Sequence, residues 1–351
     1  MTIVSRQQLG REAWDAAVEA SPEAWLWHRY DVCDTTIRDW PGRTDAGFAV
    51  LSDGDEVEAV VPAFIVQRHA SFRFPVRYLE SIGGPALATS LGRSRRRQTQ
   101  ERIAAELQTR VDASRAIRIT ISLPPMAPAL RGPDGPRCNP LLYLGCSDTS
   151  GQTWVTDLRD GVDAVWNRLE GRARTIVRKA EAAGITVRQS TSTEDWRPFF
   201  ELHQVTYRRL GVPIYPGALF RTIFEQLIPA GLCYVQFAEL NGELIAAQNI
   251  ACYKQGGYFW HGFASDAGRD FNAITLLWWH AIKNLVEGGK IQWMDCGDAV
   301  LNVREGKLRQ LSDFKRSFGG ELYPAFRGKL NGTDKFYNRL LHLKGVISGQ
   351  A

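Results

Sequence analysis

Two acidic residues flank a glycine in residues 291–298 (IQWMDCGD). Residues 291–295 are predicted to form a buried strand, so Asp295 and Asp298 fall at its carboxyl end, where open α/β sheets commonly bind their ligands. A carboxylate there can orient an attacking amine, or remove its proton through a water molecule. The alternative is an aspartate that caps its own turn, and the sequence leaves both open.

Basic residues recur at two places. Residues 164–184 are predicted to be a helix that ends at Gly184 and carries Arg172, Arg174, Arg178 and Lys179 among small residues. Guanidinium groups pair bidentately with phosphate oxygens, so this helix is either a cationic wall for a phosphate-bearing substrate or a solvated surface. A denser basic run consists of Arg93, Arg95, Arg96 and Arg97. It is either a patch that binds nucleic acid or the solvent-exposed start of a helix.

The elements that must position these residues follow a specific order in residues 232–297. Residues 232–240 and 243–253 are rich in β-branched and aromatic residues and are separated by Asn241-Gly242, which favours a tight hairpin. A third strand is predicted at 258–264, followed by a polar loop at 265–270. Apolar residues then recur at helical spacing from Ile274 to Leu285, and the strand at 291–295 follows.

The N-terminal half repeats this order with little residue identity. Helices are predicted at 6–20 and 30–40, strands at 48–51, 57–67 and 78–82, a helix at 96–113 and a strand at 117–123. Residues 124–140 are rich in proline and glycine and predict an ordered loop, and residues 141–144 have strand-like composition. We interpret the two halves as a structural duplication.

Composition narrows the class of protein. The 351 residues suffice for two medium domains, and 44% hydrophobic with 23% charged content is typical of a soluble globular protein. No apolar run approaches the roughly 20 residues that span a bilayer, and the first residues lack a signal-peptide core, so we expect a cytoplasmic location. The six cysteines lack Cys-x-x-Cys spacing, which fits reduced thiols and predicts no metal site. The net charge of +5 permits an anionic partner without requiring one.

Several segments together resemble one family. They are the basic helix 172–184, Thr206-Tyr207-Arg208-Arg209-Leu210-Gly211, Leu276-Leu277-Trp278, Asp295-Cys296-Gly297 and Phe314-Lys315-Arg316-Ser317-Phe318-Gly319-Gly320. Their order is similar to that of the Fem-type (FemABX-like) aminoacyltransferases, which have a tandem GNAT fold and add amino acids to peptidoglycan precursors. The match covers most of residues 155–345. The resemblance implies an α/β (α+β) protein with two tandem GNAT-like domains, residues 1–150 and 151–351, each a mixed, mostly antiparallel sheet flanked by helices.

The resemblance also implies roles for individual residues. Lys315 is the candidate that stabilises the carbonyl oxygen during amide formation or binds an adjacent phosphate, with Asp295 and Asp298 as the other catalytic candidates. Arg209 of the Thr-x-x-Arg-x-Gly segment is expected to hold a substrate phosphate. The full set of predicted substrate-binding residues is Arg174, Arg178, Arg208, Arg209 and Phe314.

The expected donor site departs from one group of relatives. GNAT proteins that bind coenzyme A carry Arg-x-x-Gly-x-Gly/Ala before the central helix, where small residues let backbone N–H groups approach the pyrophosphate. This chain has Arg269-Asp270-Phe271-Asn272-Ala273-Ile274 instead. Asn272 can adopt a left-handed conformation, but Ile274 would crowd a phosphate and Asp270 would repel it. Arg269 and Asn272 are the donor-binding candidates, and an ordinary acetyl-CoA site is not expected.

The resemblance implies an N-acyltransferase that forms an amide on an amine of a cell-wall, nucleotide-linked or secondary-metabolite precursor. Fem-type enzymes lack the coenzyme A loop and take aminoacyl-tRNA, so the resemblance also implies that aminoacyl-tRNA is the donor. The expected acceptor is a small-molecule or glycopeptide amine, and no tightly bound cofactor is expected. Two alternatives stay open. One is an acyl-CoA-dependent N-acetyltransferase acting on an amino sugar in polysaccharide biosynthesis, and the other is a non-catalytic module that binds an anionic glycan or RNA.

Overall fold

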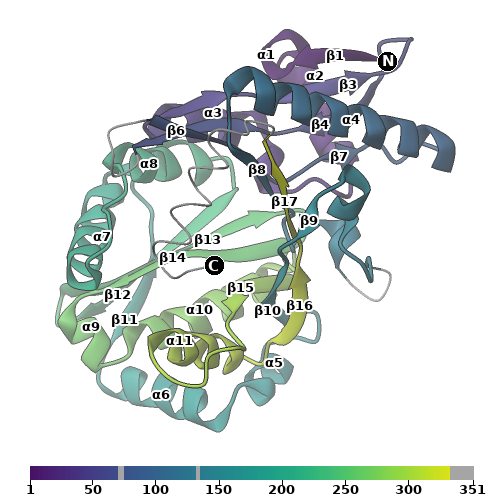
Figure 1. The fold of residues 1–351 in the computed structure, drawn as a ribbon. Helices are drawn as coiled ribbons and strands as arrows, with labels where there is room; N and C mark the ends of the chain where they lie inside the picture. Colours follow the sequence, from purple (N-terminus) through teal and green to yellow (C-terminus); the bar gives the residue numbers. More distant parts are fainter. Residues whose placement is uncertain (70–74, 132–134, 333–351) are drawn as a thin grey trace. The chain divides into compact units, whose positions relative to one another are not determined.

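The structure, a computed structural model, describes residues 1–69, 75–131 and 135–332 and divides into two compact units (Figure 1). The first unit comprises Met1–Gly151 and the described residues from Ala325 onward, and the second comprises Gln152–Pro324. The predicted second domain ran to residue 351. The structure instead places β17 (Arg327–Asn331) in the first unit, because this strand pairs with β8 (Arg118–Ser122).

The second unit is built on a seven-stranded sheet of order β11-β12-β13-β14-β15-β10-β16. Its strands are β10 (Gly151–Asp157), β11 (Thr186–Gln189), β12 (Cys233–Leu240), β13 (Glu243–Tyr253), β14 (Gly256–Ala264), β15 (Trp293–Ala299) and β16 (Glu321–Ala325). Its helices are α5 (Val162–Arg168), α6 (Gly171–Ala182), α7 (Trp196–Leu210), α8 (Gly217–Thr222), α9 (Asp266–Asp270), α10 (Ala273–Gly288) and α11 (Lys307–Arg316), with a 3-10 helix Thr193–Asp195 and a π-helical turn Ile223–Leu227.

The three strands predicted before the central helix are confirmed as an antiparallel meander, β12 to β14. Asn241 and Gly242 have φ angles of 51° and 82°, the left-handed values that a two-residue hairpin turn of this type requires. The predicted central helix is α10, and it connects β14 to β15, which pair in parallel. The parallel pairing covers only Gly256–Tyr258 and Trp293–Asp295, so hydrogen bonding between the two strands ends at Asp295.

Helices cover both faces of this sheet. A bulge in β14 at Trp260 reverses the direction of the side chains that follow it, because Asn249 pairs with His261 and Ile250 with Phe259. Phe259 therefore contacts Trp278 of α10, whereas Phe263 contacts Phe199 of α7. Figure 1 shows α7 and α10 on opposite sides of the sheet. The apolar core that includes α10, α6 and α5 also contains residues of the strands from β12 to β15 and of β10.

The first unit contains two sheets, of order β1-β3-β4-β7 and β2-β5-β6-β8-β17-β9. Besides β8 and β17, its strands are β1 (Thr2–Ser5), β2 (Arg43–Asp45), β3 (Phe48–Leu51), β4 (Val57–Val61), β5 (Phe64–His69), β6 (Pro75–Ile82), β7 (Ala86–Leu87) and β9 (Ser147–Asp148). Its helices are α1 (Arg6–Leu9), α2 (Arg11–Ala20), α3 (Tyr30–Asp39) and α4 (Arg93–Ser114), with 3-10 helices Leu26–His28, Pro128–Leu130 and Pro140–Leu144.

Both units contain the predicted common order. In the first unit β5 and β6 are antiparallel, α4 follows, and β8 returns parallel to β6, as β13, β14, α10 and β15 do in the second. The single strand predicted at 57–67 is wrong, because the structure divides it into β4 and β5 at Pro62-Ala63. Proline has no N–H to donate to a strand ladder, and the two halves belong to different sheets.

Two further local predictions are wrong for identifiable reasons. Residues 265–270, expected as a loop, form helix α9, because the Ser265 hydroxyl accepts a hydrogen bond from Gly268 N and caps the helix. Residues 141–144, expected as a strand, lie in the 3-10 helix Pro140–Leu144. Asn139 caps it, Pro140 is its first residue and Gly145 ends it with φ 76°, and these signals outweigh the apolar composition. None of the helices formed by the described residues is long and apolar enough to cross a bilayer.

Candidate functional site

A β-bulge shapes the backbone between the two candidate aspartates. Trp154 of β10 pairs with Gly297, and Val155 pairs with Asp295, so Cys296 is an extra residue on β15. Gly297 has φ 91°, a backbone conformation that glycine adopts readily and that residues with a side chain rarely adopt. The glycine of the predicted Asp-Cys-Gly segment is therefore required by the bulge, and the bulge separates the environments of Asp295 and Asp298.

Asp295 is buried beneath this bulge, with 2% of its surface exposed. Its carboxylate accepts a hydrogen bond from the Thr153 hydroxyl and a second one, of 2.7 Å, from Gly297 N. Burial raises the pKa of Asp295 to about 6, while the two hydrogen bonds act in the opposite direction. A carboxylate held in this way caps its own turn, which is the structural alternative considered from sequence. Its position suits a positioning residue that fixes the Gly297 backbone.

This raised pKa predicts a pH-dependent stability effect. The folded protein retains the Asp295 proton to a higher pH than the unfolded chain, so the ionised carboxylate lowers the free energy of unfolding above pH 6 and has no such effect near pH 3. Asp295→Asn keeps an acceptor oxygen and is expected to raise the free energy of unfolding at pH 8 by up to about 3 kcal/mol. This increase in the free energy of unfolding should become smaller as the pH falls from 6 to 4.

Urea denaturation at pH 8 and pH 4.5 measures this effect, with Asp298→Asn as the control because Asp298 is exposed. An equal loss of stability in Asp295→Asn at both pH values would show instead that the ionised carboxylate stabilises the bulge.

Lys315 lies beside the same bulge, in the last turn of α11. Its Nζ donates a hydrogen bond of 3.2 Å to the main-chain carbonyl of Asp298. Within the part of the chain that the structure describes, the ammonium makes this one hydrogen bond and no ion pair. Partial burial lowers the pKa of Lys315, and nearby Asp298, Cys296 and Asp295 oppose that shift. A Cβ atom at Gly297 would lie 2.8 Å from Lys315 Nζ, so the glycine also leaves the space that the ammonium occupies.

Packing on both sides of α11 holds Lys315 in this place. The Phe314 ring contacts Trp278 of α10 and Phe318, with ring centroids 4.9 and 5.3 Å apart. Buried Ser312 accepts hydrogen bonds from Trp154 Nε1 at 3.2 Å and from Val300 N at 3.1 Å. Phe314, predicted to bind substrate, is thus a packing residue here, and its contact with a substrate remains a prediction.

A second group of predicted residues meets at α9. Arg209 of α7 donates to Asp266 Oδ1 at 3.1 Å and to the Ala264 carbonyl at 3.1 Å, and Arg269 lies 3.6 Å from the same Asp266 oxygen. One residue was predicted to bind the acceptor and the other the donor. The structure brings both guanidinium groups to one exposed carboxylate, which an anionic ligand could replace.

Asn272 follows α9 and begins α10 with φ 53° and ψ 39°, which confirms the predicted left-handed conformation. The N–H groups of Phe271, Asn272 and Thr275 donate to the carbonyls of Ala267, Arg269 and Asn272 respectively. These backbone donors are therefore used within the segment. Fewer remain for a pyrophosphate than in an open glycine-rich loop.

The remaining predicted basic residues have separate environments. Arg174 donates to three carbonyls at the end of α5, those of Trp166, Asn167 and Leu169, and so caps that helix. Arg178 is exposed, and its guanidinium carbon lies 5.4 Å from the centre of the Trp166 ring. Arg208 is exposed at the end of α7.

The arginine run in α4 is largely neutralised within the first unit. Arg95 pairs with Glu58, Arg96 with Glu23 and Arg97 with Glu101. These ion pairs favour the structural alternative for the run over a dedicated nucleic-acid patch.

A buried aromatic cluster in the second unit was not predicted. His203 of α7 is fully buried, and its Nε2 accepts a hydrogen bond of 2.9 Å from Tyr215 N. Its ring packs 4.0 Å from that of Tyr207, and burial lowers the pKa of His203 to about 4. His261 Nδ1 lies 3.0 Å from Asn249 Oδ1, and burial lowers the pKa of His261 to about 3. Both imidazoles are neutral at pH 7, and His261 is a hydrogen-bonded structural residue.

Comparisons with known proteins agree with this architecture. Residues 168–316 match the family model described as an acetyltransferase (GNAT) domain. A search of curated proteins found no match. The crystal structure of FemX superposes with a TM-score of 0.70 and 17% identity, covering 97% of this chain and 99% of that one.

Two further solved structures are similar over nearly the whole chain. A tandem GNAT protein from the clavulanic acid biosynthesis pathway has a TM-score of 0.55 and 13% identity, covering 94% of this chain and 98% of that one. L-PGS from Bacillus licheniformis has a TM-score of 0.55 and 12% identity, covering 95% and 96%. At these identities the likeness concerns the fold. The chain therefore has a tandem GNAT fold similar to that of these solved structures, and residues 168–316 of its second unit match the model of a GNAT acetyltransferase domain.

Proposed function

We propose that this protein is an N-acyltransferase that forms an amide on an amine of a cell-wall, nucleotide-linked or secondary-metabolite precursor, with aminoacyl-tRNA as the donor. One observation carries the proposal. Lys315 presents two uncommitted ammonium hydrogens, among the described residues, from a partly buried position beside the Gly297 bulge. A fixed cation in such a place stabilises the oxyanion that develops when an amine attacks an ester carbonyl.

The two aspartates take different roles in this proposal. Asp298 is exposed next to the Lys315 ammonium, so its carboxylate is the candidate that orients the acceptor amine or receives its proton through water. Asp295 acts through the backbone, because its buried carboxylate holds Gly297 N. The Phe-Lys-x-x-Phe-Gly-Gly segment supports this assignment by its resemblance to the Fem-type signature.

The donor is inferred from the segment that precedes α10. Coenzyme A needs backbone N–H groups for its pyrophosphate, and here three of them donate within the segment, while Ile274 and Asp270 remain unfavourable neighbours for phosphate. An ester-linked donor without that pyrophosphate fits better. The direct test incubates the protein with charged tRNA pools and, separately, with acyl-CoAs, and identifies the consumed donor and the amide product by mass spectrometry.

Salt dependence distinguishes the donors independently. Activity with aminoacyl-tRNA is expected to fall steeply between about 50 and 200 mM salt, because each phosphate contact releases counterions. Acyl-CoA carries few charges, so its use should change little over this range. Initial rates at several salt concentrations measure the slope. A flat profile together with calorimetric binding of coenzyme A to the unmodified protein would contradict the tRNA donor and favour acyl-CoA transfer to an amino sugar. Stoichiometric glycan or RNA binding without any amide product would favour a binding module.

Arg178 offers a test of acceptor binding. Arg178→Ala is expected to raise KM for the acceptor about tenfold with little change in kcat, because a phosphate contact made equally in ground and transition states contributes only to binding. The matched control is Arg221→Ala. Arg221 stacks on Trp196 at 4.8 Å in the same unit, as Arg178 does on Trp166, but it is not predicted to bind substrate. Equal effects of the two changes would assign Arg178 to packing alone.

A further inference from the structure

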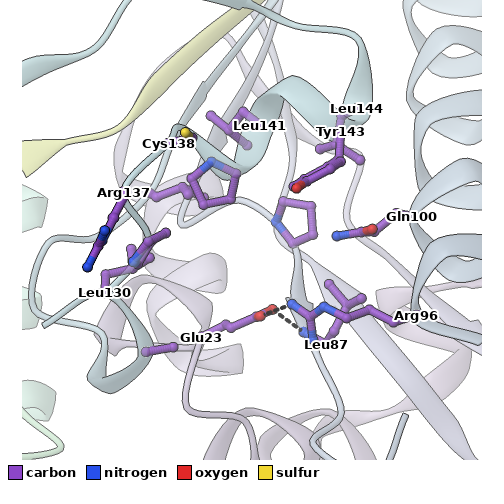
Figure 2. Close-up of a pocket in the computed structure, with 15 residues that line it drawn as sticks. Glu23, Leu87, Arg96, Gln100, Leu130, Arg137, Cys138, Leu141, Tyr143 and Leu144 are labelled. Atoms are coloured by element: carbon purple, nitrogen blue, oxygen red, sulfur yellow. Dashed lines mark hydrogen bonds and ion pairs between the residues drawn. The ribbon is translucent and has the colours of Figure 1, made fainter. Parts of the chain in front are cut away.

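The first unit contains a cavity that the proposed acyltransfer chemistry does not use. Its volume is about 480 Å³, and it lies between the first turns of α4 and the 3-10 helix Pro140–Leu144 (Figure 2). This volume is within the usual range for sites that bind small organic molecules. All of its lining residues belong to the first unit.

Most of the cavity wall is apolar. Leu87, Leu130, Leu141 and Leu144 line it together with several prolines. The apolar surface continues outward over the same 3-10 helix, where Tyr143 is 76% exposed and its neighbour Leu142 is 48% exposed. A ligand with an apolar body would remove this surface from water, which is the main source of affinity in such sites.

The polar groups of the wall are divided between two sides. Figure 2 shows Gln100 and Tyr143 on the same side as the ion pair between Glu23 and Arg96, and Arg137 on the opposite side, near Leu130. Glu23 is fully engaged, because its second oxygen accepts a 3.0 Å hydrogen bond from Leu87 N. Arg137 is exposed and has no carboxylate partner among the residues that the structure describes.

The charges of the wall favour an anion over other ligands. Two arginines and one glutamate line the cavity, and the glutamate is already neutralised. A cationic ligand would face Arg137 without a free counter-charge. A neutral ligand that covered Arg137 would leave a guanidinium poorly solvated and unpaired, which is unfavourable.

We propose that this cavity is a binding site for a small amphipathic carboxylate. The apolar body lies against Leu87, Leu130 and Leu141, and the carboxylate pairs with the Arg137 guanidinium. Gln100 and the Tyr143 hydroxyl are available to a polar group at the other end of the ligand. The site is independent of the proposed transfer reaction, because it involves none of the residues assigned to that chemistry.

Octanoate is the probe for this proposal, measured by calorimetry with the full-length protein. Acetate supplies the same carboxylate without the apolar body, and octan-1-ol supplies the body without the charge. Octanoate is expected to bind at least about tenfold more tightly than either control, because both interactions are needed. Equal affinity for octanoate and octan-1-ol, or no octanoate binding up to its solubility limit, would overturn the proposal.

Variants and a chemical probe locate the site. Arg137→Ala is expected to weaken octanoate binding about tenfold, whereas Arg93→Ala, an exposed arginine outside the cavity, should leave it within twofold. Leu130→Trp should also weaken binding by filling the space for the apolar body, with melting temperature checking that it folds. Cys138 lines the cavity and is exposed, so octanoate should slow its alkylation by N-ethylmaleimide. Equal effects of Arg137→Ala and Arg93→Ala, or unchanged alkylation of Cys138 at saturating octanoate, would place the binding elsewhere.

Discussion

Lys315→Ala is expected to lower kcat by about a hundredfold or more while the protein keeps its fold. The Lys315 ammonium is partly buried, donates to the Asp298 carbonyl and retains two hydrogens for an oxyanion. Removing one preorganised donor to such an oxyanion typically costs about 3–4 kcal/mol of transition-state stabilisation. The loss should appear in kcat and in kcat/KM to a similar extent, because the interaction exists only in the transition state.

Two matched variants separate this role from general effects on α11. Lys307→Ala removes an exposed lysine from the first turn of the same helix and should leave turnover near wild type. Lys315→Arg keeps the charge but changes its shape, so partial activity is expected. Near wild-type turnover in Lys315→Ala would remove the lysine from the mechanism. Because burial lowers the pKa of Lys315, wild-type activity should also decline on the alkaline side at a pH below 10.5.

Gly297→Ala is expected to lower turnover by about tenfold or more and also to destabilise the protein. The φ angle of 91° disfavours any side chain, which costs about 1–2 kcal/mol. The added Cβ would lie 2.8 Å from Lys315 Nζ and must displace the ammonium from the bulge. Moving the ammonium away from the reacting carbonyl lowers turnover in addition to the loss of stability.

Gly242→Ala is the control for backbone strain alone. Gly242 has φ 82° in the hairpin between β12 and β13, and a Cβ there would meet nothing within 4 Å. Both variants should lose stability in urea denaturation, but only Gly297→Ala should lose turnover of the remaining folded protein. A Gly297→Ala protein with normal turnover would show that the spacing between the bulge and Lys315 is unimportant.

Local sequence signals predicted much of the fold. The Asn241-Gly242 turn, the period of α10 and the repeated order in both halves depend on interactions between near neighbours, and each is confirmed. Predictions failed where one local signal competed with another. Apolar composition suggested a strand at 141–144, but the Asn139 cap and Pro140 produced a 3-10 helix.

At the candidate site, the sequence and the tertiary structure supplied different information. The sequence by itself supplied the candidate residues, because the Asp-Cys-Gly and Phe-Lys segments resemble the signature of the Fem-type family. Only the tertiary structure decided the burial and the contacts of these residues. It buried Asp295 and exposed Asp298, placed Lys315 beside Gly297, and joined Arg209 and Arg269 at Asp266. Burial and ion pairing depend on residues distant in the chain, such as Thr153 for Asp295, and therefore on packing that no local pattern specifies.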